Sequence, residues 1–120
     1  MGIMFKVILD MSCFNDAVLL SGEDNIENIS VEGITIVERP DIANWIKGGE
    51  LLLTSFYSIE NNLDAQIKLV EEVAKNGAAG IVIKTSVTYE RISQTIIDKS
   101  NAIGFPIIEI PRERKYIDIL

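Results

Sequence analysis

The sequence contains no histidine and only one cysteine. Histidine is the commonest general base near neutral pH and the commonest metal ligand, so we expect no metal and no cofactor. The single thiol, Cys13, cannot form an internal disulfide, and a lone cysteine is typical of a reducing compartment. Without a neighbouring histidine to hold it as thiolate, Cys13 is interpreted as inert. Motifs of nucleophilic, phosphate-binding and zinc-dependent enzymes are also missing, so we predict no catalytic residues.

The chain is also poor in basic residues and in long apolar runs. Eleven Lys and Arg stand against eighteen Asp and Glu, which gives a formal net charge of −7. Affinity for a phosphate backbone depends on clustered cations, so this charge argues against direct binding to nucleic acid. No apolar run approaches the ~20 residues of a membrane helix, and the start lacks the pattern of a signal peptide. We therefore expect a cytoplasmic protein with no membrane partner.

A chain of 120 residues with 48% hydrophobic residues is long enough for one globular domain with a single core. From position 51 onward, short continuous apolar runs occur at 51–53, 81–83 and 107–110. Such runs are typical of strands that are buried on both faces of a parallel sheet. The sequence therefore predicts an α/β fold, with a mostly parallel sheet flanked by helices and built from successive βα units.

Two helices are predicted between these strands. The first has apolar residues at helical spacing over 63–74, with Asn62 as a capping residue and Gly77 placed to end it. The second repeats this design from a cap at Thr88 to a terminating glycine, Gly104. The spacing of Gly77 and Gly80 is like that of a phosphate loop, but these glycines precede a strand. Helix termination and close packing are therefore the favoured interpretation.

The first third of the chain is less regular. A helical turn is predicted at 7–13, a strand at 17–20, a turn at 22–25 and another strand at 34–38. Residues 1–3 are treated as introduced by cloning and are given no structural role.

The most specific motif of the sequence lies between Ile34 and Thr54. It reads E-x-P-D followed by W-x-x-G-G-E-L-L-L-T. Pro40 bars a helix before that position, and Asp41 can cap the next turn. This motif resembles the sequence of the N-terminal domain of the PucR family of bacterial transcription regulators, which is named for control of purine catabolism. The resemblance continues through N-G-A-A-G-I-V-I-K at 76–84 and G-F-P-I-I-E-I-P at 104–111.

The resemblance implies a regulatory input domain that senses a small metabolite, with purine-catabolism products as the first class to test, or that mediates self-association as a homodimer. In that family the domain is followed by a longer region that ends in a helix-turn-helix, through which DNA would be bound. We expect an N-terminal segment at 1–13 and the PucR-like domain at 14–120. The apolar residues at 116–120 suggest that this chain is cut from a longer regulator.

Ligands of open α/β sheets gather beyond the carboxyl ends of the strands. Glu109 interrupts an apolar run there, and a carboxylate buried without a partner would be costly, so it must face solvent, a ligand, or a cation such as Lys84 or Arg112. Ordinary βα loops contain the same residue types, so a purely structural role remains open. The predicted ligand-binding residues are Glu38, Arg39, Thr54, Ser55, Lys84, Thr85 and Glu109.

Two alternatives belong to other classes of protein. A structural interaction module would dimerise without a small molecule, and a self-complementary apolar patch would favour it. A small enzyme acting through carboxylates would need two of Glu38, Glu50 and Glu109 to converge in a deep cleft.

Overall fold

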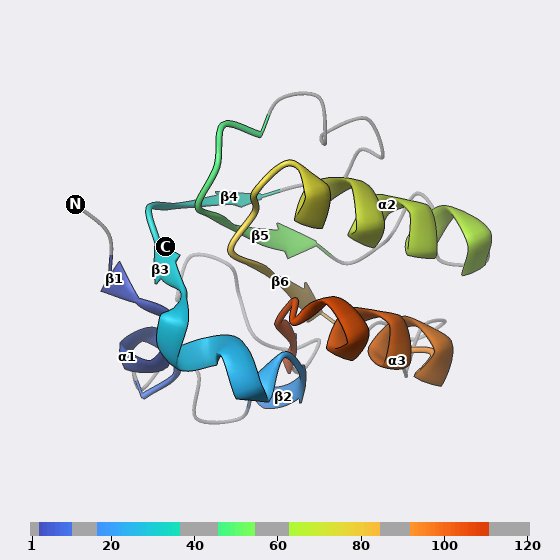
Figure 1. Ribbon diagram of the computed structural model, residues 1–120, viewed down its shortest axis with the longest axis horizontal. Helices are drawn as coiled ribbons and strands as arrows, with labels where there is room; N and C mark the ends of the chain where they lie inside the picture. Colours follow the sequence, from blue (N-terminus) through green and yellow to red (C-terminus); the bar gives the residue numbers. More distant parts are fainter. Residues whose placement is uncertain (1–2, 11–16, 37–45, 55–62, 85–91, 111–120) are drawn as a thin grey trace.

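The computed structural model describes residues 3–10, 17–36, 46–54, 63–84 and 92–110. Its centre is a five-stranded sheet with the strand order β2-β7-β6-β5-β4 (Figure 1). The strands are β2 (Val18–Ser21), β4 (Gly33–Ile36), β5 (Glu50–Thr54), β6 (Gly80–Lys84) and β7 (Ile107–Ile110).

Four neighbouring strands of this sheet run parallel. β4 pairs with β5, β5 with β6 and β6 with β7 in the same direction, and β2 pairs with β7 antiparallel at one edge. The three apolar runs that the sequence predicts as strands form β5, β6 and β7, which lie side by side. The predicted α/β fold with a mostly parallel sheet is therefore confirmed.

Two layers cover the sheet. On one face lie α2 (Leu63–Lys75) and α3 (Gln94–Ile103), side by side with their C-terminal ends at the same end of the sheet (Figure 1). The other face is covered by the N-terminal part of the chain. This layer contains β1 (Ile3–Met4), α1 (Phe5–Leu9), the 3-10 helix η2 (Glu23–Asn28) and β3 (Ser30–Val31), which pairs with β1.

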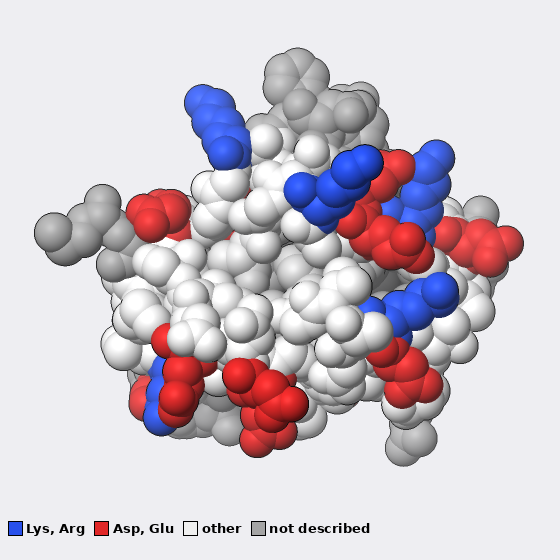
Figure 2. Space-filling model, viewed as in Figure 1, with Lys and Arg blue, Asp and Glu red and all other residues white. Residues whose placement is uncertain are grey.

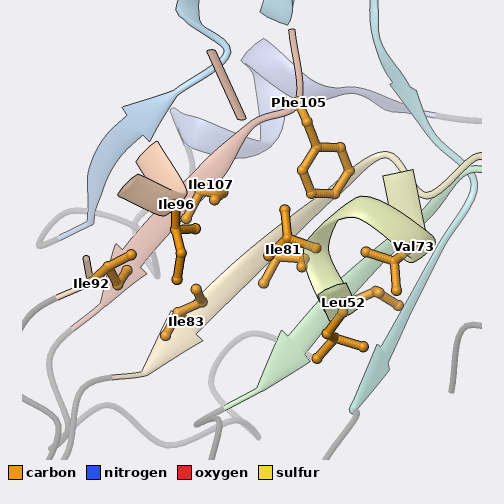
Figure 3. Packing of buried hydrophobic residues seen from close by; sticks show 10 residues of the cluster. Leu52, Val73, Ile81, Ile83, Ile92, Ile96, Phe105 and Ile107 are labelled. Atoms are coloured by element: carbon orange, nitrogen blue, oxygen red, sulfur yellow. The ribbon is translucent and has the colours of Figure 1, made fainter. Parts of the chain in front are cut away.

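Alternating side chains of the central strands divide the core between the two faces. In Figure 3, Ile81 and Ile83 of β6 point toward the helical layer, where Val73 and Ile96 meet them. Val82, between them in sequence, faces the N-terminal layer. Because both faces of the central strands are shielded from water, residues at successive positions are apolar. This explains the continuous apolar runs in the sequence. On the face toward the N-terminal layer, the buried side chains of the strands pack against those of that layer. They are Leu51, Leu53, Val82, Ile108 and Ile110 from the strands and Phe5, Ile8, Ile26 and Val31 from the N-terminal layer.

Both helices of the helical layer end at the glycines that the sequence predicts. Gly77 has φ 92° and Gly104 has φ 70°, so both adopt the left-handed conformation that favours glycine. At α3 the N–H groups of Gly104 and Phe105 donate to the carbonyls of Asn101 and Ser100, which satisfies two groups at the helix end.

The start of α3 differs from the prediction. The helix begins at Gln94, and its cap is Ser93, whose hydroxyl accepts the N–H of Thr95 at 3.2 Å. Thr88 lies outside the described residues, and Ile92 is buried ahead of the helix. Threonine and serine are both good caps, so the sequence pattern alone could not choose between the two positions.

The N-terminal layer contains three further differences. Ile3, for which the sequence predicts no structural role, pairs with Val31, and the helical turn spans Phe5–Leu9 instead of starting at Val7. The turn predicted at 22–25 is the start of the longer 3-10 helix η2. Phe5 is fully buried, so this segment is part of the core. None of the described helices is both long and apolar enough to cross a membrane.

The packing of Phe5 on the sheet predicts the effect of one substitution. A Cβ atom at Gly80 would lie 2.7 Å from Cε2 of the buried Phe5 ring, so Gly80→Ala should lower the free energy of unfolding by about 1–3 kcal/mol through overpacking. Gly33→Ala in β4 is the matched control, because no atom lies within 4 Å of the added carbon. Urea unfolding of the three proteins measures this difference. Equal losses in both variants would contradict a specific contact with Phe5.

Candidate functional site

The carboxyl ends of the strands hold three of the predicted ligand-binding residues within the described part of the chain. Thr54 is the last residue of β5 and is only 3% exposed. Lys84 is the last residue of β6, and Glu109 is the third of β7, and both are half-buried. The other four predicted residues lie outside the described residues: Glu38, Arg39, Ser55 and Thr85.

The sheet register separates these three side chains. Ile83 is paired with both Thr54 and Glu109, which therefore point to the same face as Ile83, toward the helical layer. Lys84 follows Ile83 and pairs with Ile110, so it belongs to the opposite face. This placement does not favour a direct ion pair between Lys84 and Glu109. Within the described residues, the Glu109 carboxylate makes no hydrogen bond or ion pair.

A pocket of about 550 Å³ lies at the other end of the sheet, where β6 and β7 begin. Four stretches of chain line it: the end of α2 with the loop into β6, the end of α3 with the loop into β7, the part of the N-terminal layer around η2 and β3, and Gly49 just before β5. Sequence reasoning did not find this pocket. The available signal was the pair of helix-ending glycines, Gly77 and Gly104, both of which line it.

Hydrogen bonds hold the walls of the pocket together. The side-chain N–H of Asn25 donates to the carbonyl of Gly104 at 3.1 Å, and the hydroxyl of Ser21 donates to the carbonyl of Phe105 at 2.8 Å. On the other side, the N–H of Gly49 donates to the carbonyl of Gly77 at 2.7 Å. These bonds join residues far apart in sequence, so the pocket is formed by the fold itself and does not require a ligand to assemble it.

The interior of the pocket is mostly apolar, and charges stand at its rim. Ile29, Ile103 and Phe105 contribute apolar surface, whereas Glu71 and Lys75 are exposed residues of the last turns of α2. Figure 2 shows the uncharged surface in the middle of this face, with charged side chains of α2 above it and acidic side chains of the N-terminal layer below it. Such a concave apolar site with a few polar groups is typical of small-molecule binding.

Glu50 has a structural role beside this pocket. Its carboxylate accepts the backbone N–H groups of Lys47 at 2.9 Å and Gly48 at 2.8 Å. Partial burial alone would raise the pKa of Glu50, but these backbone hydrogen bonds, with a smaller contribution from the Lys47 charge, outweigh it and hold the pKa below its ordinary value. Glu50 thus fixes the turn that carries Gly49 into the pocket wall.

The described carboxylates do not converge as an enzyme of the carboxylate class would require. Glu50 is the first residue of β5, whereas Glu109 lies near the end of β7, so the two occupy opposite ends of a parallel sheet. Among the described residues, no group of three acidic, histidine or cysteine residues could hold a metal ion.

The chain is similar to known regulators over nearly its whole length. Residues 7–120 match the profile of the purine catabolism regulatory protein-like family, PucR. The chain is 31% identical over 113 residues to the purine catabolism regulatory protein of Bacillus subtilis (strain 168). That alignment covers 94% of this chain and 21% of the relative, so the chain spans about a fifth of the length of that protein.

The hydrogen bonds of Glu50 predict a pH-dependent effect on stability. At neutral pH, Glu50→Gln should lower the free energy of unfolding by about 1 kcal/mol, because an amide replaces a charged acceptor of two N–H groups. The folded-state pKa is depressed, so this contribution is complete above the ordinary value of 4.5 and is lost as the pH falls through the folded-state pKa. Chemical unfolding at a series of pH values should therefore show the two proteins converging in acid.

Glu27→Gln is the control for this prediction. Glu27 is exposed and, within the described part of the chain, pairs with the exposed Lys6 at 3.1 Å, an interaction expected to contribute little. A Glu50→Gln effect that persists unchanged in acid would contradict the proposed role of the carboxylate charge.

Proposed function

Because this chain belongs to the purine catabolism regulatory protein-like family, we propose that it is the regulatory input domain of a bacterial transcription regulator and that it senses a small metabolite in the cytoplasm. The observation that carries this proposal is the pocket of about 550 Å³ at the amino end of the sheet. Its volume lies within the range of roughly 300–1,000 Å³ that is usual for small-molecule sites.

The construction of the pocket supports sensing more than catalysis. Its walls come from four stretches of chain that are distant in sequence, so a ligand bound between them would add to the stability of their arrangement. The chain has no histidine, and the described charged groups of the pocket are one carboxylate and one ammonium at the rim. A ligand-dependent change in stability is the elementary event that an input domain requires.

The name of the relative supplies the first metabolites to test. That protein is a purine catabolism regulatory protein, and we extend this to propose that purines or their breakdown products are the effectors here. The net charge of −7 opposes contact with a phosphate backbone, so DNA binding is assigned to a helix-turn-helix outside this chain.

Self-association is a second function that a separate observation favours. Three apolar residues within five positions of the N-terminal layer are strongly exposed: Ile3 at 48%, Met4 at 42% and Val7 at 52%. Exposed apolar surface of this kind is often covered by a partner, and twofold dimers are the commonest assemblies of soluble proteins. We propose that this N-terminal apolar patch contributes to a homodimer.

Thermal unfolding with purine-related compounds tests the sensing proposal. We expect at least one of xanthine, urate and allantoin to raise the Tm of the chain in a concentration-dependent manner, and uracil, as a control of similar chemistry, to leave it unchanged. A ligand at 100 times its Kd adds about 2.7 kcal/mol to the stability, which corresponds to a rise of several degrees in a domain of this size. A constant Tm with every purine compound would contradict purine sensing by this chain.

Light scattering tests self-association. The wild-type chain should show the mass of a dimer at micromolar concentrations, and Val7→Glu should raise the dissociation constant about tenfold or more by placing a charge in the patch. Leu63→Glu is the matched control, since Leu63 is also exposed but lies at the start of α2. A monomeric mass for the wild type, or an equal effect of both substitutions, would contradict the N-terminal interface.

A further inference from the structure

We infer that the outer edge of β4 is a second self-association surface, where two copies of the chain pair antiparallel around a twofold axis that passes between their Thr35 residues. The occupant of this edge is therefore a second copy of the chain. The inference goes beyond the proposed function, because the edge shares no residue with the N-terminal apolar patch and requires no ligand. It follows from the accessibility of β4, the direction of its backbone groups and its side-chain pattern.

β4 is the outermost strand on one side of the sheet, and no other described strand pairs with its outer edge (Figure 1). Proteins usually block such an edge with a bulge, a charged side chain or a proline. At the opposite edge of the sheet, β2 has a register shift between Leu19 and Ser21. β4 has none of these devices: its register with β5 is regular, and Gly33–Ile36 contains no charged residue and no proline. β4 is thus the unprotected edge of the sheet.

The described parts of the two covering layers leave β4 accessible. On the face of the helical layer Thr35 is exposed, and a Cβ atom at Gly33 would have no atom within 4 Å. On the other face Ile36, which is paired with Leu53, is 44% exposed. A strand of a second copy that lies beside β4 would therefore cover apolar surface that is now in contact with water.

The backbone groups of two isoleucines in β4 point away from the sheet. The N–H of Ile81 donates to the carbonyl of Pro106 at 3.1 Å, so Ile81 directs its backbone groups toward β7. This direction alternates along a strand, and the registers of the parallel pairs carry the alternation from β6 through β5 to β4. Thr35 therefore directs its N–H and C=O toward β5. Ile34 and Ile36 direct theirs to the outer edge.

An antiparallel pair centred on Thr35 uses all of these outward groups. Ile34 of each copy then lies opposite Ile36 of the other, and the two residues exchange N–H···O=C hydrogen bonds. Their side chains meet on the face of the N-terminal layer, and the two Thr35 side chains meet on the opposite face, both of which are favourable cross-strand pairs. A register centred on Ile34 would instead place Ile36 opposite the carboxylate of Glu32. The side-chain pattern thus selects one register.

The charge of the chain favours this edge for a second copy. Two copies that each carry a net charge of −7 repel one another, so they associate best where acidic side chains are few. Gly33–Ile36 is uncharged. The edge is short and buries little area, so we expect a weak interaction with a dissociation constant on the order of 0.1 mM. Together with the N-terminal apolar patch, it would join dimers into tetramers at high concentration.

Hydrogen exchange tests the strand pairing residue by residue. The Val7→Glu variant is used, because it weakens the N-terminal patch and leaves β4 unaltered. NMR should show the amides of Ile34 and Ile36 exchanging about threefold more slowly at about 1 mM than at about 50 µM, which is the change in free chain for a dissociation constant of this order. The amide of Thr35, which is directed to β5, should be protected at both concentrations. Equal exchange of Ile34 and Ile36 at the two concentrations would overturn the inference.

Sedimentation of charge variants gives a second test in the same Val7→Glu background. Ile36→Lys places on the edge the kind of charge that usually blocks strand pairing, so the dissociation constant should rise about tenfold or more. Val18→Lys is the matched control: Val18 is 52% exposed on β2, at the other edge of the sheet, and the gain of charge is the same. An equal effect of both lysines, or a Val7→Glu variant that stays monomeric at about 1 mM, ten times the expected dissociation constant, would overturn pairing through β4.

The outcome for β4 is independent of the proposed function. A dimer that persists in Val7→Glu and is removed by Ile36→Lys supports the β4 interface even if the N-terminal patch proves to have no part in self-association. Loss of all association in Val7→Glu would support the N-terminal patch and overturn the β4 interface.

Discussion

Burial of three adjacent parallel strands on both faces is the constraint on which the rest of this structure depends. β5, β6 and β7 cannot be exposed on either side, so the chain must supply two covering layers. α2 and α3 form one of them. The N-terminal part of the chain forms the other, with Phe5 completely buried against the sheet. The pocket exists because these two layers, at the beginning of β6 and β7, meet around the ends of the strands.

Sequence reasoning succeeded where a pattern has one physical solution. Short continuous apolar runs are typical of strands that are covered on both faces, and they predicted β5, β6 and β7. Glycine is favoured in the left-handed conformation that often ends a helix, so Gly77 and Gly104 predicted the ends of α2 and α3. It was less precise where several residues could do the same task. Ser93 and Thr88 are equivalent as caps by type, and the cap of α3 in the structure is Ser93. The two-residue pairing of Ile3 with Val31 is too short to leave a sequence pattern.

The candidate site shows a different limit of sequence reasoning. The carboxyl ends of parallel strands are the usual ligand edge, and that rule directed attention to Thr54, Lys84 and Glu109. The pocket at the amino end depends on how two helix ends and η2 approach one another, through contacts such as that between Asn25 and Gly104. Contacts between residues so far apart in sequence leave no local pattern, so they could be recognised only in the folded structure.

The pairing of β2 with β7 has a consequence for how the domain is made. The first strand of the large sheet, β2, lies beside its last, β7, and hydrogen bonds near this edge join residues 79 and 84 positions apart. Contacts of such long range are slow to form, because a large loop must close before they contribute. During synthesis, β2 therefore cannot pair with β7 until β7 has emerged from the ribosome. Completion of the sheet, and with it of the pocket wall tied to Gly104 and Phe105, is thus among the last events in the biogenesis of this domain.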